Sequence, residues 1–292
     1  MVLNKKNLLV KLRKETLAPF GECAKALEEA KYDYEQAKKL LFKKSIKQSV
    51  ASGLGDTDFP EGKIFKVELP KNNTISALFC IRAETDFVTN SADFKKLAEE
   101  LSAILLDYLS SGQTSLDLEG FLKLISPKDQ LSIEEKVSAL SSITKEKIKI
   151  TDLIISPQEE KDIISLAYVH HNEKLGAILS LKTGPKTDLK NIAEIRKLIL
   201  HYAASSSLFL NEQEICPKWL EEEKSKLKAS LLEKNPNIPN IDNIINKQIK
   251  QIVSKVTFSE QPFILDPSLS ISQILFHNDL TPIWGKKIVL SS

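Results

Sequence analysis

A repeated order of two strands followed by a helix constrains the fold of this chain most. The first copy starts at residue 63 and reads "KIFKVEL", "PKNN" and "TISALFCIRA", with "ETDFVTN" before a helix. The second copy reads "IISLAYV", "HHNEK" and "LGAILSLKT", with "GPKTDLKN" before the helix "IAEIRKLILHYAA". Alternating apolar residues are typical of strands, and apolar residues three or four apart are typical of one helix face. Two such units predict a core of α+β type.

The junctions between the second strand and the helix differ between the two copies. Residues 84–90 take the place of residues 184–191, and only the first junction contains a large aromatic residue, Phe87. A ring at such a position is either part of the core or a contact for a partner. Asp86 beside it either caps the following helix or serves the same contact. Asn90 or Ser91 is the predicted N-cap of that helix.

The segments outside the repeat predict further helical parts. Near the N-terminus, apolar residues at helical spacing are interrupted at "LAPFGE" and "KYDY", which predicts three short helices that form a docking module. The turn "NPNIPN" separates a charged helix from a second helix with a seam of isoleucines, which predicts an antiparallel hairpin. The last segment has helix and strand character and is expected to return to the sheet. The expected organisation is a three-helix partner-docking domain at 1–48, a linker at 49–62, core subdomain N at 63–155, core subdomain C at 156–207 and 258–292, and the helical hairpin at 208–257.

Composition excludes several classes of protein. Lys and Arg total 41 against 39 Asp and Glu in 292 residues, and this mixed charge lacks the basic footprint of a nucleic-acid binder. No apolar run approaches the roughly 18 residues that cross a membrane. Cys23, Cys80 and Cys216 are far apart, so neither a disulfide framework nor a zinc site is expected. The sequence predicts a cytoplasmic protein without a nucleic-acid or membrane partner.

Catalytic motifs are missing from the sequence. No G-x-S-x-G, H-E-x-x-H or G-x-G-x-x-G stretch occurs, and Gly62-Lys63 is followed by Ile64 where a phosphate-binding loop needs Ser or Thr. His170 and His171 are adjacent at a strand end, so their side chains are expected to point to opposite sides and not to share a metal. We therefore expect no catalytic residue, no cofactor and no metal, which makes this a protein that is not an enzyme.

Five segments, in order, resemble the bacterial translation elongation factor Ts family. They are "LVKLRKET" with "ECAKALEEAKYDYEQAKKLL", then "ETDFV", "YVHHNEKLGAILSL", "LILHYAA" and "EQPFILDPSLSISQIL". The first resembles the ubiquitin-associated-like domain of the family, and the second matches its Thr-Asp-Phe-Val signature. Leu17, Ala18 and Pro19 depart from the family, since they occupy the place of its glycine turn.

The resemblance implies a guanine-nucleotide exchange factor that binds elongation factor Tu in its GDP-bound and nucleotide-free forms. It assigns partner binding and Mg²⁺ dislocation to Thr85, Asp86, Phe87 and Val88. It also implies a homodimer through the helical hairpin in some relatives. Further partner contacts that it implies are Leu175, Gly176, His201, Ile264 and Leu265. The alternative from another class is a non-catalytic adaptor or scaffold that uses its ubiquitin-associated-like domain for docking.

Overall fold

Three helical segments form the N-terminal part of the protein. The computed structural model describes residues 5–16, 20–41, 59–69, 75–157, 162–236 and 238–290. Helices α1 (Lys5–Thr16) and α2 (Phe20–Glu29) and a helical segment at 34–41 surround a small apolar core. The predicted break at "KYDY" has a local cause, because Lys31 and Tyr32 adopt positive φ angles and Asp33 then accepts a hydrogen bond from the Gln36 amide. The divergent turn at 17–19 and residues 42–58 lie outside the described residues.

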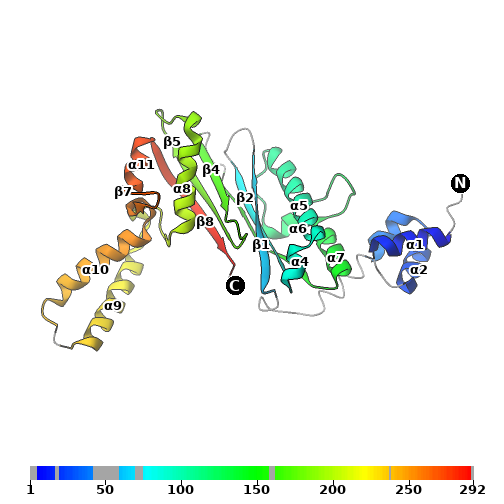
Figure 1. Ribbon diagram of the computed structural model, residues 1–292, viewed down its shortest axis with the longest axis horizontal. Coiled ribbons are helices and arrows are strands. Elements are labelled where there is room, and N and C mark those ends of the chain that lie inside the picture. Colours follow the sequence, from blue (N-terminus) through cyan, green and yellow to red (C-terminus); the bar gives the residue numbers. More distant parts are fainter. Residues whose placement is uncertain are drawn as a thin grey trace.

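The first sheet is antiparallel and has the order β1-β2-β3. Its strands are β1 (Glu61–Glu68), β2 (Ser76–Ala83) and β3 (Ile148–Ile155). Strand β1 begins within the stretch that the sequence predicted as linker, and β3 is a strand that the sequence reading missed. Helices α5 (Ala92–Ser110), α6 (Leu118–Lys123) and α7 (Ile133–Thr144) cover one face of this sheet (Figure 1).

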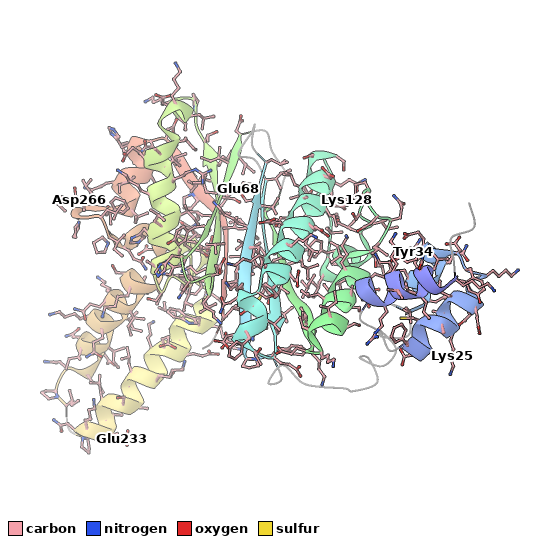
Figure 2. The ribbon with its side chains drawn as sticks, turned by 45° about the vertical axis from the view of Figure 1, so that its right-hand side comes forward. Lys25, Tyr34, Glu68, Lys128, Glu233 and Asp266 are labelled. Atoms are coloured by element: carbon pink, nitrogen blue, oxygen red, sulfur yellow. The ribbon has the colours of Figure 1, made fainter. Side chains whose placement is uncertain are left out.

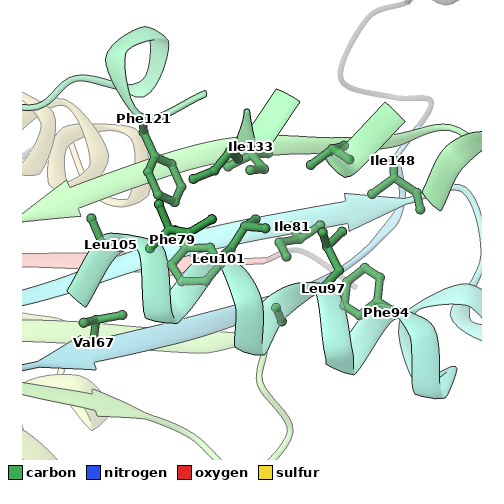
Figure 3. Packing of buried hydrophobic residues seen from close by; sticks show 14 of the residues in the cluster. Val67, Phe79, Ile81, Phe94, Leu97, Leu101, Leu105, Phe121, Ile133 and Ile148 are labelled. Atoms are coloured by element: carbon green, nitrogen blue, oxygen red, sulfur yellow. The ribbon is translucent and has the colours of Figure 1, made fainter. Parts of the chain in front are cut away.

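Large side chains fill the space between this sheet and its helices (Figure 3). Phe79 lies at the centre of the cluster, with its ring centroid 5.4 Å from that of Phe65 and 5.6 Å from that of Phe121. The stripe predicted on the helix after the first junction supplies Phe94, Leu97, Leu101 and Leu105. The first junction packs against this core.

The second sheet repeats the arrangement with the order β4-β5-β8. Its strands are β4 (Ile163–Val169), β5 (Leu175–Thr183) and β8 (Leu280–Val289), and helices α8 (Ile192–Ala204) and α11 (Ile271–His277) pack on it. The last segment of the chain therefore returns to the sheet, as the sequence predicted. Each sheet contains one strand more than the two-strand unit expected from the repeat. The mixture of helices and antiparallel sheets confirms the α+β class.

The two sheets pack against each other through their other faces (Figure 1). Buried serines join them, since the Ser76 hydroxyl donates to the Ser165 carbonyl oxygen at 2.7 Å. Glu68 lies between the two halves (Figure 2), where its Oε1 accepts from the Ala167 amide and from Arg196. The apolar part of this contact consists of Ile64, Leu78, Cys80, Ala167, Ile178, Ile288 and Leu290.

Helices α9 (Pro217–Lys234) and α10 (Ile241–Val256) run side by side and project from the second half (Figure 1). Helix α9 buries none of its residues, and α10 buries Ile245 and Ile249. Figure 2 shows Glu233 near the outer end of α9. The remaining elements are α4 (Asp86–Asn90), η2 (Leu189–Asn191), η3 (Glu212–Glu214), η4 (Phe258–Glu260), β6 (Pro262–Phe263) and β7 (Asp266–Ser270).

One local expectation about the two adjacent histidines is wrong. The ring centroids of His170 and His171 are only 4.1 Å apart, whereas the sequence predicted that the side chains point to opposite sides. Strand β4 ends at Val169, so both histidines lie in the turn, where the alternation of a strand no longer applies.

Within the described part of the chain, we find no helix that is both long and apolar enough to span a membrane.

Candidate functional site

Phe87 lies on the short helix α4, which starts almost directly after strand β2. Its side chain is 84% exposed, although the preceding strand is almost entirely buried. Burying a phenylalanine side chain is worth about 1.5–3 kcal/mol, so a ring left in water gives up that stabilisation. The reading of Phe87 as a core residue is therefore excluded, and the ring is available for a contact outside this chain.

Thr85 and Val88, on either side of the exposed Asp86 and Phe87, anchor α4 to the body of the protein. Val88 is buried in the core cluster under helix α5. The Thr85 hydroxyl lies 2.9 Å from both carboxylate oxygens of Glu146, so it donates to this side chain. Thr89, also buried, donates its hydroxyl to the Asp86 carbonyl oxygen at 3.1 Å. The helix is thus fixed from below, and Asp86 and Phe87 face solvent.

Asp86 does not cap the helix that follows it. Thr85 is the N-cap of α4, and Asp86 is the first residue inside that helix. The cap of α5 is Ser91, whose hydroxyl oxygen accepts from the Phe94 amide at 3.2 Å, as one of the two sequence predictions had it. Because the chain makes a separate turn of helix before α5, the capping role passes to a later residue. The carboxylate of Asp86 stays exposed beside Phe87.

Two glutamates that the sequence reading missed connect the first junction to the turn before β3. Glu146 accepts from the Thr85 hydroxyl, and Glu84 accepts from the Lys147 amide at 2.9 Å. Each segment thus supplies one carboxylate and one donor to the other. Sixty-one residues separate Thr85 from Glu146, and no periodic pattern relates positions so distant, so nothing in the sequence indicated this contact.

His201 is buried on α8 and holds a second exposed turn. Its Nδ1 accepts from the Ile264 amide at 3.2 Å, and its Nε2 lies 2.8 Å from Oε1 of Gln261. Because Nδ1 accepts, the proton of the neutral ring is on Nε2, which donates to Gln261. Burial lowers the pKa of His201, and the positive charge of Lys287 lowers it further. This histidine is therefore a neutral, hydrogen-bonded residue of the interior.

The turn that His201 holds presents two aliphatic side chains to solvent. Ile264 and Leu265 are 55% and 58% exposed and form the two-residue connection between β6 and β7. On either side of this connection, Phe263 of β6 pairs with Asp266 of β7. Asp266 marks the outer edge of this half in Figure 2. The structure thus brings three of the predicted contact residues, His201, Ile264 and Leu265, into one unit.

The remaining two predicted residues, Leu175 and Gly176, begin strand β5. Leu175 packs partly against the second core, and Gly176 is buried between the sheets. A Cβ atom at Gly176 would lie 2.7 Å from Cγ2 of Ile64. Only glycine therefore fits this close approach, and the neighbour it admits belongs to the same chain. In the described residues, no group of three or more His, Cys, Asp or Glu side chains could hold a metal ion.

Comparisons with known proteins point to one family. Residues 84–288 match the family model described as "Elongation factor TS", and this match begins at the first junction. The curated protein "Elongation factor Ts" of Cytophaga hutchinsonii is 29% identical over 283 residues, which cover 96% of this chain and 96% of the relative. That of Borreliella afzelii is 28% identical over 269 residues, 91% of this chain and 88% of the relative. That of Syntrophotalea carbinolica is 26% identical over 286 residues, 98% and 89% of the two chains.

The family model covers well over half of the 292 residues, including both junctions, strand β3 of the first sheet, nearly all of the second sheet and the helical pair between α8 and β6. The relatives extend the similarity to nearly the full length of the chain. The chain belongs to the elongation factor Ts family.

Proposed function

We propose that this protein is a guanine-nucleotide exchange factor, which promotes GDP release from elongation factor Tu during translation elongation in the cytoplasm. The observation that carries this proposal is the exposed ring of Phe87 on a helix that is anchored on its other side. Membership of the elongation factor Ts family supports it. The proposed activity needs no covalent chemistry by this chain, because GDP leaves its partner unchanged.

Binding energy alone can drive such an exchange. A factor that binds the nucleotide-free partner more tightly than the GDP-bound partner must weaken GDP by the same ratio. Each 1.4 kcal/mol of this difference is about a tenfold change in affinity. A single aromatic anchor that fills a pocket at an interface typically supplies at least about 2 kcal/mol. One well-placed ring is therefore sufficient for a large part of the effect.

In the proposed mechanism, Phe87 enters an apolar site of the partner and displaces the elements that hold Mg²⁺ and the nucleotide. Asp86 is next to it and exposed, so its carboxylate engages the partner near the metal. Loss of Mg²⁺ leaves the phosphates of GDP without their main charge compensation, which favours dissociation. Thr85 and Val88 keep the helix in place, since both side chains are directed into the protein's own structure.

Additional contacts give the complex its affinity. We propose that the turn with Ile264 and Leu265 binds the partner through its exposed side chains, while His201 supports the turn. Leu175 is a further candidate contact beside Gly176. We also propose that the three N-terminal helices form the ubiquitin-associated-like docking domain and that the pair α9 and α10 is the surface for a homodimer.

A stopped-flow assay tests the proposal directly. Elongation factor Tu is loaded with fluorescent GDP and mixed with excess GDP, with or without this protein. We expect the release rate to rise with the concentration of this protein and to saturate. A release rate that does not change, together with binding of the partner in a sedimentation experiment, would leave the adaptor function as the better description.

A further inference from the structure

We infer that Glu146 is a positioning residue that fixes the helix carrying Phe87 in the orientation required by the partner. This inference rests on the proposed function and extends it to a residue of a distant segment. Glu146 itself does not lie on α4, and it acts through Thr85.

The contact replaces a bond that helix α4 would otherwise make within itself. A threonine at an N-cap normally accepts a hydrogen bond from an amide of the first turn. Thr85 makes no such bond in α4, and its hydroxyl donates to Glu146 instead, at 2.9 Å. The N-terminal end of this helix is therefore held by a tertiary contact.

A helix as short as α4 needs that support. It contains five residues, and isolated helices below about 12 residues are marginal in water. Val88 fixes one point of the helix in the core. Thr89, next to Val88, is also buried, so the C-terminal part of the helix is fixed, and the bond to Glu146 provides a fixed point at the other end. Two points define the direction in which Phe87 projects.

Glu146 is itself held rigidly. Its amide donates to the Thr144 hydroxyl at 3.3 Å, and Lys145 before it has the left-handed conformation, with a φ of 60°. On its other side, the Lys147 amide donates to Glu84 and the Ile148 amide donates to the Ser141 hydroxyl at 3.0 Å. The turn before β3 is thus bonded to both α7 and the first junction, so the backbone that carries the Glu146 side chain is fixed.

This geometry has a defined effect on exchange. A helix that moves freely must be ordered when the partner binds, and that ordering opposes association. A helix already fixed by Glu146 avoids this loss. Removing the contact should therefore raise the KM for the partner and change kcat little, because Phe87 makes the same contacts once bound.

The test uses the full chain with Glu146→Ala and Glu146→Gln, and with Glu99→Ala on α5 as a matched control at an exposed glutamate. Amide hydrogen exchange of α4 is measured without any partner, and GDP release from elongation factor Tu is measured in parallel. In Glu146→Ala we expect α4 amides to exchange about tenfold faster and the KM to rise about tenfold, the usual size of a lost charge-assisted hydrogen bond. Glu146→Gln keeps an acceptor for Thr85 and should restore most of both values.

A double variant separates this contact from a general loss of stability. Thr85→Val combined with Glu146→Ala should be no worse than the more damaging single variant, because both remove the same bond. The inference is overturned if α4 is equally protected in Glu146→Ala and the parent, or if protection falls and the KM does not change. If the parent protein itself does not accelerate GDP release, the proposed function fails, and the α4 amides still decide whether Glu146 holds the helix.

Discussion

The two junctions of the repeat contain nearly the same tripeptide and use it differently. The first has Thr85-Asp86-Phe87 and the second has Thr187-Asp188-Leu189, each between the second strand of a unit and its helix. In the second junction, the Asp188 carboxylate accepts from the Lys190 amide at 2.9 Å and so caps η2. In the first, Thr85 is the cap residue, and Asp86 lies one position later, inside the helix.

This difference shows which residues serve the fold. In the second junction, the Thr187 hydroxyl lies 2.9 Å from the Asp279 carbonyl oxygen, so both polar side chains of the tripeptide hold local structure. In the first junction, only Thr85 does so. Leu189 is 53% exposed and Phe87 is 84% exposed. The fold therefore accepts a capping aspartate and a smaller apolar residue at this place, and Asp86 with Phe87 remains free for a partner.

The largest effect should come from Phe87→Ala. We expect kcat/KM for GDP release to fall about 30- to 100-fold, because an aromatic anchor at an interface is worth at least about 2 kcal/mol. Thermal unfolding should be unchanged, since the ring is exposed in the free protein. Leu189→Ala is the matched control and should change kcat/KM less than about twofold. Equal losses in the two variants would contradict the assignment of different roles.

Replacing Asp86 should affect nucleotide exchange, whereas replacing Asp188 should affect stability. Asp86→Ala should lower kcat/KM about tenfold without lowering stability, because the carboxylate supports no local structure but engages the partner. Asp188→Ala should lower the free energy of unfolding by about 1 kcal/mol, the usual value of an N-cap, and leave exchange nearly unchanged. Urea denaturation and the GDP release assay together measure both. A stable Asp188→Ala variant would show that the cap of η2 contributes nothing.

Most of the framework could be predicted from the sequence, because it depends on local periodicity. The repeat, the cap at Ser91 and the return of the last strand all follow from patterns within short windows. Strand β3 was missed because it follows directly on helix α7 and its turn, and its last five residues are only half-buried, so its alternation is weak. The contacts of Thr85 with Glu146 and of His201 with Ile264 join residues about 60 positions apart, which no window contains.

The helices after the two junctions also differ, and the pH dependence of stability should show this difference. Helix α8 contains the buried His201, whose folded-state pKa is lowered by burial and by Lys287. The unfolded state therefore binds a proton that the folded state does not, so stability falls as the pH drops below the unfolded value of about 6.5. His201→Gln should show a smaller loss between pH 7 and pH 5.5 in thermal unfolding. An identical pH profile in this variant would exclude His201 as the cause.

The smallest effect should come from the turn held by His201. Leu265→Ala removes part of an exposed apolar side chain and should raise the KM for elongation factor Tu about threefold, as expected for a contact at the edge of an interface. Stability should not change, because Leu265 is 58% exposed. Ser268→Ala on β7 provides a nearby exposed control. A KM equal to that of the parent would remove this turn from the proposed contact surface.

The central claim is that the ring of Phe87 is in water in the free protein and inside elongation factor Tu in the complex. A fluorinated phenylalanine placed at position 87 reports this directly, because the fluorine resonance of an exposed ring shifts between H₂O and D₂O. We expect a full solvent shift in the free protein, as the 84% exposure requires. On addition of nucleotide-free elongation factor Tu, the shift should disappear. A solvent shift that persists in the complex would contradict the role of Phe87 as the inserted residue.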